Sequence, residues 1–457
     1  MFQMLQILEN PCHIGRRIVR DQRGVTAIIT GIALTVLLGF AGLAIDVAVW
    51  LNATRGMQAA ADQAAYSAAY AAGTNGCPNT SASTQALAVA AARGYTNGSN
   101  NTTVTTSCPS TSTFKVAISQ IQPMWFSALF LSSAPTAGAQ ATAQLASRVS
   151  DLCVLALDGT NPAASQVGSQ ADATDLGGTT VLNLNCGLAV DSNSSMALSV
   201  GGHASLTATD IYLVGDDQGS PSGSATVATS PTANNILRHQ PPIEDPYAGR
   251  DFSLPSTCAS GVGGSGTADP SKVLPGLAFC GGLHLGQPGQ GHNDTYNLAA
   301  GTYYVVGGSL NIDASATVNG TGVTFVLTGN ALGQSGYASL TVNGSSSVSL
   351  SAPTSGPLGG LVFFQDRNAP APTQAGTCSS ANAQNKINGG ATQLITGALY
   401  FPSQSVCFTG NSSTTGVGKC TQLIARTLDF TGTSSLQLSC TGSGIEPITY
   451  LVPTLIR

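Results

Sequence analysis

Charged residues are scarce in this sequence: Asp, Glu, Lys and Arg make up only 8% of its 457 residues, against about 25% in ordinary soluble domains. Apolar residues reach 42%, so the chain is not of the charge-rich disordered kind. The net charge of −5 provides no basic surface, and we expect no nucleic-acid partner. Polarity comes instead from Ser, Thr, Asn, Gln and 54 Gly, a composition that favours strands and turns over helix bundles.

Motifs of metal binding and catalysis are also missing. No CxxC pair and no Cys/His cluster with metal-ligand spacing occurs, which argues against zinc. The GxSxG, HExxH, P-loop and EF-hand patterns are absent. Candidate carboxylate pairs for sugar hydrolysis are Asp210 with Asp216 and Asp217, or Asp294 with Asp313, and each lies in or beside a turn, where Asp is common. We therefore expect no enzyme activity, no catalytic residue, no cofactor and no metal.

The cysteines are distributed unevenly along the chain. Only Cys12 precedes the long apolar run, and ten others follow it, an even number that favours an oxidising compartment. The alternative is that small cysteines simply fill a core. Proximity in the chain suggests the pairs Cys77 with Cys108, Cys153 with Cys186, and Cys258 with Cys280. The last four allow three connectivities, of which we favour Cys378 with Cys407 and Cys420 with Cys440.

A membrane anchor is indicated near the N-terminus. Residues 24–45 carry no charge, and a helix of about 22 residues is roughly 33 Å long, enough to cross a hydrocarbon core of about 30 Å. Signal peptides have shorter apolar regions of about 7–15 residues, so a retained anchor is favoured over a cleaved one. We expect residues 1–23 to form a cytoplasmic tail and residues 24–51 a single transmembrane helix.

The orientation follows from arginine placement. Four arginines precede the apolar run and only Arg55 follows it closely, so the positive-inside rule places the N-terminus in the cytoplasm. The four are Arg16, Arg17, Arg20 and Arg23. Nearly all of the chain would then lie outside the cytoplasm, and the membrane is its first expected partner.

Six residues of the anchor are candidates for helix packing and membrane positioning. Trp50 would lie at the outer interface. Asp46, at the outer end, is either an interfacial carboxylate facing water or a docking contact to a partner helix. A small residue recurs every fourth position, which permits close helix–helix approach but is also ordinary in transmembrane helices. These residues are Ala27, Gly31, Thr35 and Gly39.

Residues 52–148 are expected to form a helical stalk and a small α/β domain. The alanine-rich stretch predicts that the anchor helix continues to about Ala72, and a second helix is predicted over residues 83–93. Residues 113–121 alternate with strand periodicity, as do residues 137–146, so two strands are expected. Between them, WFSALFL predicts a short apolar helix.

Beyond residue 151 the sequence consists of short apolar segments separated by Gly, Asn and Ser. This pattern predicts a mainly β region, which we interpret as a right-handed parallel β-helix-like domain, with a β-sandwich as the alternative. A Pro-rich crossing at 237–257 separates a first β part, 151–236, from the main β-solenoid-like part, 258–447. Whether the two parts stack together stays open.

The N-terminal third contains RDQRG, a span closing with GFAGLAIDVAVWL, the helix QAAADQAAYSAAYAAG, and the FSALF and ATAQLA segments. Over about residues 18–148 this order resembles TadG-like (TadE/TadG-like) proteins of the Flp (Tad) pilus-assembly system. The resemblance implies a bacterial inner-membrane protein of pilus assembly or adhesion, with other pilus-assembly proteins as partners. Surface glycans are a further candidate partner of the β region. Relatives processed as pseudopilins carry Gly followed five residues later by Glu; here Ile29 follows Gly24, which favours an untrimmed anchor.

One departure from many TadG-like proteins concerns the DxSxS metal motif of a von Willebrand type A domain. Asp191 opens the matching letters DSNSS, but no strongly apolar parallel strand precedes them and no helical pattern follows. We interpret the segment as a turn. Two hypotheses for function remain: a structural or adhesive envelope protein of a pilus system, and a surface carbohydrate-active enzyme or carbohydrate-binding β-helix.

Overall fold

The computed structural model describes most of the chain outside its first 21 residues and divides it into two compact units. The described residues are 22–73, 76–149, 151–159, 174–217, 221–229, 236–286, 294–371, 384–388, 392–409, 412–413, 420–436 and 444–456. Unit 1 comprises residues 1–146 and 452–457, and unit 2 comprises residues 147–451. Unit 2 is therefore inserted between the body of unit 1 and its last strand.

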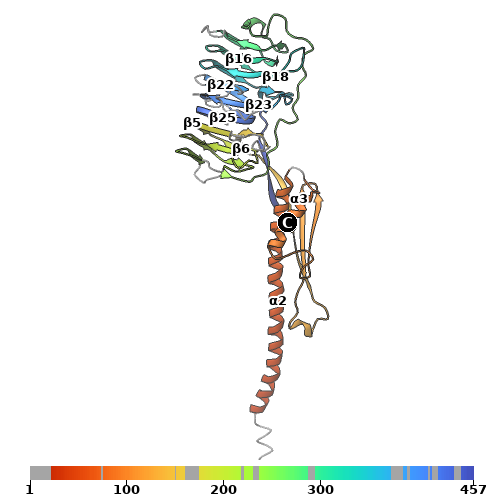
Figure 1. The fold of residues 1–457 in the computed structure, drawn as a ribbon. Helices are drawn as coiled ribbons and strands as arrows, with labels where there is room; N and C mark the ends of the chain where they lie inside the picture. The colour runs from red at the N-terminus through yellow and green to blue at the C-terminus, as the bar shows by residue number, and fades with distance from the viewer. Residues whose placement is uncertain are drawn as a thin grey trace, which may run out of the picture. The chain divides into compact units, whose positions relative to one another are not determined.

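Unit 1 combines two helices with a four-stranded sheet in the order β1-β2-β3-β26 (Figure 1). Its pairs β1–β2 and β2–β3 are antiparallel. The elements are α2 (Gln22–Ala72), α3 (Thr80–Ala92), β1 (Thr102–Ser110), β2 (Thr113–Ile121), the 3-10 helix η2 (Ser127–Leu129), β3 (Thr136–Val149) and β26 (Thr449–Ile456).

Alanine makes the core of unit 1 compact. Between Met57 and Ala72, helix α2 buries alanines on one side against α3 and the sheet, where the inward-facing residues of β2 are Phe114, Val116 and Ile118. An alanine side chain loses no rotamer freedom in a helix and permits close packing, so a helix of this composition can cover a sheet of small residues. The strand β3 contributes Ala141 and Ala143 to the same core.

The expected elements of unit 1 are largely present. Helix α2 runs unbroken to Ala72 as predicted, and the two predicted strands are β2 and β3. The short apolar helix predicted for WFSALFL is wrong in extent, because only the single 3-10 turn η2 forms there. Strands β1 and β26 were not anticipated; β26 contains Pro453, which an edge strand tolerates because its outer N–H groups need no partner.

Unit 2 is built almost entirely from short parallel strands. The strands are β4 (Leu152–Ala156), β5 (Thr174–Leu184), β6 (Gly187–Val190), β7 (Leu198–Val200), β8 (Ser205–Ala208), β9 (Ile211–Leu213), β10 (Thr226–Thr229), β11 (Ile236–Leu237), β12 (Ala278–Cys280), β13 (Leu283–Leu285), β14 (Thr295–Leu298), β15 (Gly301–Val306), β16 (Ser309–Ile312), β17 (Thr317–Thr321), β18 (Val323–Thr328), β19 (Ser339–Val342), β20 (Ser347–Ser351), β21 (Leu361–Gln365), β22 (Asn385–Asn388), β23 (Thr392–Thr409), β24 (Ser412–Ser413) and β25 (Thr421–Leu436). A further 3-10 turn, η4, covers Pro270–Lys272. The predicted mainly β fold is confirmed, with its sheet pairing in parallel.

The strands repeat in groups of three. From β12 to β20 each strand pairs in parallel with the third strand after it, so that β12, β15, β18 and β21 form one face of a stack of coils. In Figure 1 the labelled strands β18, β23, β25 and β6 follow one another along this stack. Parallel pairing between successive coils favours the β-helix-like interpretation over a sandwich of antiparallel strands.

The two β parts form one stack, joined in an unexpected order. Strand β25, the last of the main part, pairs in parallel with β4 and β5, the first strands of the N-terminal part. The chain therefore builds outward from β4 to β11 at one end, crosses to β12 at the other end, and returns to β25 beside its starting point. One hydrophobic core runs through both parts.

Residues 238–257, which we call the strap, make this crossing along one side of the stack (Figure 1, green). The strap residues Ile243 and Tyr247 form a second apolar cluster on the outside of β4, β6, β18, β21 and β23. Those strands are covered on both faces. Their sequences, such as LCVLA and VTFVLT, suit this environment because they are nearly continuous apolar runs, and the structure buries them at every position.

Polar groups fix the strap to the coils. The carboxylate of Asp191 accepts the N–H of Ile243 at 2.9 Å, and the Tyr400 hydroxyl donates to Asp245 at 2.5 Å. The hydroxyl of Tyr247 donates to Gln422 at 3.0 Å. Burial raises the pKa of both tyrosines above its ordinary value, so both hydroxyls remain protonated donors.

Candidate functional site: the anchor helix and its adjoining loop

The first half of α2 presents an apolar surface to its surroundings. Its large side chains are exposed between Ile28, at 66%, and Ile45, whereas the second half is packed in the core of unit 1. Within the described residues, α2 is the one helix long and apolar enough to cross a membrane. Exposed Ile, Leu, Val and Phe in an unbroken helix are stable in a hydrocarbon environment and unfavourable in water.

The small-residue stripe lies on this exposed segment. Ala27, Gly31 and Thr35 are exposed, and no heavy atom lies within 4 Å of a Cβ built on Gly31 or Gly39. The hydroxyl of Thr35 donates to the carbonyl of Ile32 at 2.7 Å, so it is satisfied within its own helix. At Gly31 and Gly39, a Cβ would therefore meet no described atom outside the backbone of the helix itself, and both interpretations of the stripe stay predictions.

Asp46 holds a loop of its own chain. Its side chain is only 1% exposed, so of the two alternatives the water-facing carboxylate is wrong for this structure, and the docking contact to a partner helix stays a prediction. One oxygen, Oδ2, accepts the backbone N–H groups of Trp125, Phe126 and Ser127 at 3.2, 2.9 and 2.7 Å. Three N–H groups that point to one carboxylate oxygen bind it strongly. The same hydrogen bonds give partners to the backbone N–H groups at the start of η2.

Two further contacts join the loop to α2. The indole N–H of Trp50 donates to the carbonyl of Pro123 at 3.0 Å, so this ring is fixed by hydrogen bonding as well as by its position on the helix. The ring of Phe126 lies over Gly42, where a Cβ would come within 2.5 Å of the ring. The sequence did not identify Gly42 as a contact residue. The pattern that could have identified it is its position one helical turn before Asp46, on the same side of the helix.

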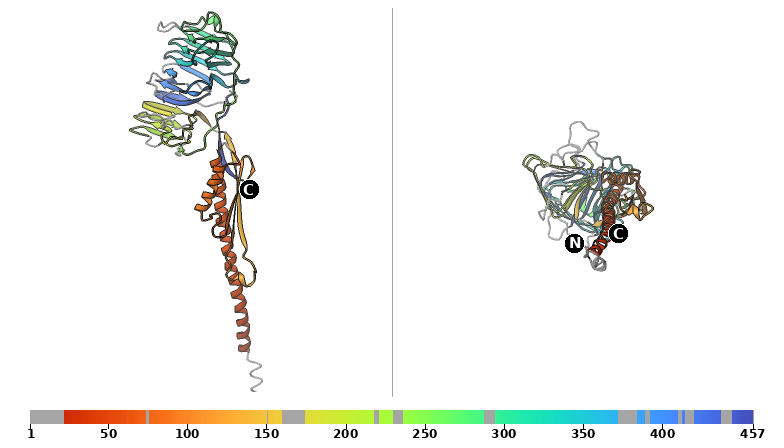
Figure 2. Two further views of the ribbon diagram at one scale, coloured as in Figure 1. Left: turned by 45° about the vertical axis from the view of Figure 1, so that its right-hand side comes forward. Right: turned by 90° about the horizontal axis from the view of Figure 1, so that it is seen from below.

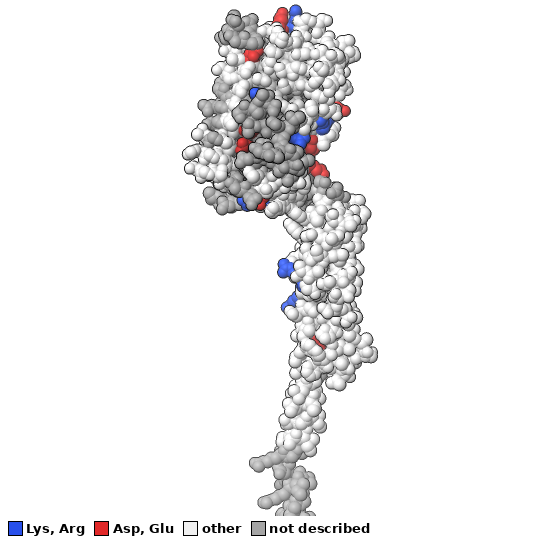
Figure 3. Space-filling model, in the orientation of Figure 1, with Lys and Arg blue, Asp and Glu red and all other residues white. Residues whose placement is uncertain are grey.

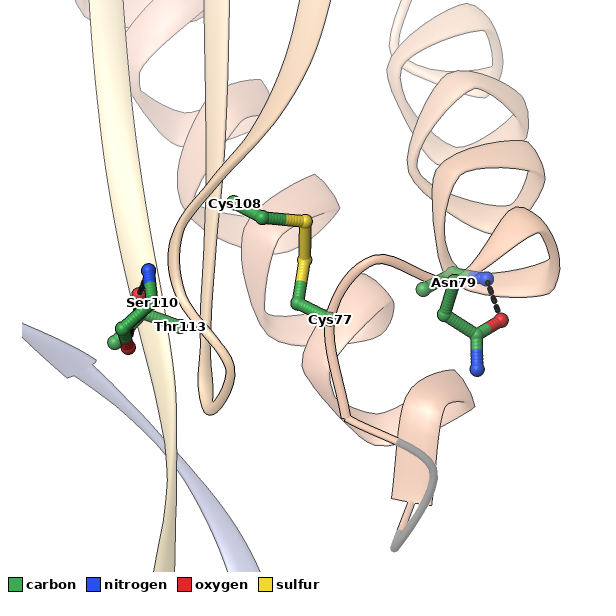
Figure 4. Close-up of a disulfide and its surroundings, with 6 residues drawn as sticks. Cys77, Asn79, Cys108, Ser110 and Thr113 are labelled. Atoms are coloured by element: carbon green, nitrogen blue, oxygen red, sulfur yellow. Dashed lines mark hydrogen bonds between the residues drawn. A yellow bond between two sulfur atoms is a disulfide. The ribbon is translucent and has the colours of Figure 1, made fainter.

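The disulfide Cys77–Cys108 lies at the other end of unit 1. It joins the segment after α2 to β1 with a Cα–Cα distance of 5.7 Å (Figure 4). Next to it, the Asn79 side chain accepts the N–H of Ala82 at 3.2 Å and caps the start of α3. The bond thus holds the end of α2, the start of α3 and the sheet together.

Two more disulfides lie in unit 2 and match the pairs predicted from chain proximity. Cys153–Cys186 and Cys258–Cys280 have Cα–Cα distances of 5.8 and 5.6 Å, within the usual range for such bonds. Cys407 and Cys420 are also disulfide-bonded. Cys378, Cys440 and Cys12 lie outside the described residues, so the predicted pairs Cys378 with Cys407 and Cys420 with Cys440 stay predictions.

We expect non-reducing peptide mapping of the alkylated protein to recover five disulfide-linked peptide pairs, including Cys378 with Cys407 and Cys420 with Cys440. The reason is that Cys407 and Cys420 are each in a disulfide and each has one of these partners nearby in the chain. Cys12 should carry the alkylating group, since it precedes the anchor. Recovery of linked Cys407 and Cys420 peptides, or of most of the ten thiols alkylated, would contradict the pairing.

Three of the candidate carboxylates of unit 2, Asp216, Asp217 and Asp313, are engaged in structural contacts. Asp217 and Asp216 both pair with Arg238, and Asp313 lies 4.0 Å from His284. Burial raises the pKa of Asp313 above its ordinary value. Among the described residues, no group of three or more His, Cys, Asp or Glu could hold a metal ion.

The DSNSS segment hydrogen-bonds locally. The Ser194 hydroxyl accepts the N–H of Met196 at 3.1 Å, and the Ser192 hydroxyl accepts the N–H of Ser194 at 3.3 Å. The Asp191 carboxylate binds the strap, as described above. A buried parallel strand, β6, does precede the segment, so the expectation that no such strand precedes it was wrong. The local contacts nevertheless agree with the interpretation of the segment as a turn.

The described surface of unit 2 contains a broad hollow of about 770 Å³. It is lined by the strap at Asp251 and Phe252 and by coil residues that include Tyr304, Thr321 and Pro353. Asp251 is the one acidic residue of this lining, so the hollow lacks the facing carboxylates of a sugar hydrolase. Charged residues are sparse on the described surface drawn in Figure 3.

Comparisons with known proteins bear on the anchor helix. Neither the curated proteins nor the solved structures contain a significant match to this chain. A family model does match, over the segment that contains Asp46, Trp50 and the small-residue stripe. Residues 24–72 match the family described as putative Flp pilus-assembly TadE/G-like, so the helix that anchors this chain in a membrane is similar to that family.

Proposed function

We propose that this protein is a structural or adhesive component of Flp/Tad pilus assembly, anchored in the bacterial inner membrane by one helix. Its N-terminus lies in the cytoplasm, and the α/β unit and the β unit lie outside. The observation that carries the proposal is the TadE/G-like helix α2, whose exposed apolar half continues without a break into a disulfide-bonded unit. Disulfides persist in compartments outside the cytoplasm. Its expected partners are the membrane and other pilus-assembly proteins.

A non-enzymatic role agrees with the chemistry of unit 2. Its adjacent carboxylates Asp216 and Asp217 both form an ion pair with Arg238, and the hollow beside the strap has a single acidic residue. Neither arrangement provides an acid and a base on opposite sides of a bond. A stack of coils with outward Ser, Thr and Asn side chains is suited to contact with other proteins or with surface glycans, which are the second class of ligand we propose.

The proposed topology predicts an all-or-none result in protease protection. Protease added to intact spheroplasts should digest the chain beyond Trp50 and leave the peptide before Gly24 intact, because the arginine asymmetry keeps that end inside. A cytoplasmic marker protein must remain intact in the same sample, and detergent should make the N-terminal peptide accessible. Protection of the region beyond Trp50 in intact spheroplasts would refute the orientation.

A further inference from the structure

The loop held by Asp46 exposes an unusual concentration of large apolar side chains. Leu129 is 81% exposed, Phe130 69% and Trp125 59%, and Phe126 and Leu131 are also exposed. No charged residue occurs between Lys115 and Arg148, so no charge in the loop opposes an apolar surrounding. Isolated exposed apolar residues are normal, but five within seven positions form a patch that marks a contact with a membrane or a partner.

Helix α2 fixes the height of this patch relative to the anchor. The loop contacts α2 at Gly42, Asp46 and Trp50, the outer end of the exposed apolar segment. At about 1.5 Å per residue, the 20 residues from Thr26 to Asp46 span about 30 Å, the thickness of a hydrocarbon core. The loop therefore lies at the outer boundary of the hydrocarbon core. Figure 2 shows it lying alongside α2.

Several backbone N–H groups of the loop are already hydrogen-bonded, as an apolar environment requires. Unpaired N–H groups are costly in lipid, and the N–H groups of Trp125, Phe126 and Ser127, at the start of η2, all donate to Asp46. The N–H groups of Leu129 and Phe130 donate to backbone carbonyls within the loop at 3.2 and 2.9 Å.

We propose that residues 123–131 enter the outer leaflet beside α2 and form a second membrane contact, with Leu129 and Phe130 as the inserted side chains. The occupant of this patch is the lipid bilayer, because the patch continues the apolar surface of the anchor itself at the same height. Asp46 and Gly42 act as positioning residues that hold the loop against the helix. The loop then sets the depth and rotation of α2, and with them the presentation of unit 1 at the membrane. This inference rests on the anchoring role proposed above.

The two tryptophans of the chain, Trp50 and Trp125, provide the probe. The full-length protein is reconstituted into phosphatidylethanolamine/phosphatidylglycerol vesicles that contain phosphatidylcholine brominated at either a shallow or a deep acyl position. The emission of Trp125 is obtained as the difference between the wild type and the Trp125→Phe variant. We expect shallow bromine to remove most of the Trp125 emission and aqueous acrylamide to remove little of it.

Two variants test the loop itself. The double variant L129S/F130S should lose the quenching of Trp125 by bromine and gain quenching by acrylamide, whereas Leu87→Ser, an exposed leucine on α3, should change neither. Asp46→Ala should have the same effect as L129S/F130S, because the loop loses its three hydrogen bonds. Asp62→Ala is the matched control, since Asp62 lies on the same helix and binds Gln58 instead.

Vesicle flotation separates this proposal from the anchoring role. All variants should float with the vesicles, because α2 still spans the bilayer. Floating protein whose Trp125 is open to acrylamide and unaffected by bromine would overturn the loop proposal alone and leave the loop as a surface for a protein partner. Protein that fails to float would overturn the anchoring role as well.

Discussion

Replacing Phe325 with alanine should lower the free energy of unfolding of unit 2 by about 3–5 kcal/mol, the usual cost of deleting a fully buried phenylalanine side chain. Phe325 is completely buried inside the coils. Its ring lies between Tyr303 of the preceding coil, at 5.3 Å, and Phe363 of the following coil, at 5.7 Å. Because these three residues are in register on successive strands, a cavity at Phe325 removes contacts on both sides.

The measurement can distinguish the two units of the chain. Both tryptophans lie in unit 1, so tryptophan fluorescence reports unfolding there, whereas hydrogen exchange of peptides from residues 147–451 reports unfolding of unit 2. In a urea series in detergent, Phe325→Ala should shift the unfolding of the unit 2 peptides to lower urea and leave the fluorescence transition nearly in place. Leu274→Ala, at a half-exposed leucine of unit 2, should change stability by less than about 0.5 kcal/mol. An equal effect of the two substitutions would contradict the stacked-coil core.

Replacing Asp191 with asparagine should stabilise unit 2 at pH 8 and have little effect near pH 4. Burial raises the pKa of Asp191 from its ordinary value of 3.8 to about 7, and the nearby Asp245 adds to the shift, while the hydrogen bond from Ile243 opposes it. In the unfolded chain the group should titrate near its ordinary value. Between these pH values the folded protein binds more protons than the unfolded chain, so stability falls as pH rises.

The size of this effect follows from the pKa shift. Each pKa unit corresponds to about 1.4 kcal/mol, so the ionised Asp191 costs on the order of 4 kcal/mol above pH 7, and asparagine relieves most of it. Asparagine can still accept the N–H of Ile243 through its amide oxygen, which keeps the strap in place.

The pH series is measured by urea unfolding of both proteins between pH 4 and pH 8. Asp269→Asn is the control with the opposite sign, because hydrogen bonds from Ser271 lower the pKa of the exposed Asp269. Its small effect should therefore be a loss of stability that disappears in acid. A gain from Asp191→Asn that does not change with pH would contradict the assigned cause.

The membrane site was only partly predictable. The sequence located Asp46 and Trp50 at the outer end of the apolar run, because charge, aromatic type and helix length can all be read locally. It did not reveal that Asp46 receives three N–H groups from residues about 80 positions away. Nor did it identify Gly42, whose importance depends on the ring of Phe126 lying over it. A contact between distant segments leaves no local pattern in either of them.

Strand β26 illustrates the same limit at the level of domains. Its segment TYLVPTLI reads as an apolar tail with a proline, and only the tertiary structure pairs it with the sheet of unit 1. The boundary therefore could not be found from composition, because unit 1 is discontinuous in sequence and unit 2 is inserted into it.

By itself, the sequence determined the anchor, the uninterrupted helix to Ala72, the mainly β character of the remainder and the disulfides Cys77–Cys108, Cys153–Cys186 and Cys258–Cys280. These depend on hydrophobic length, helix propensity, period-two alternation and loop closure, which act over short stretches of chain. Only the tertiary structure decided that β25 stacks on β4 and β5, and that the strap covers β18 and β21. The apolar runs LVFFQ and LCVLA require burial on both faces. Many segments of the chain could cover them. Only the folding of the complete stack places the strap there.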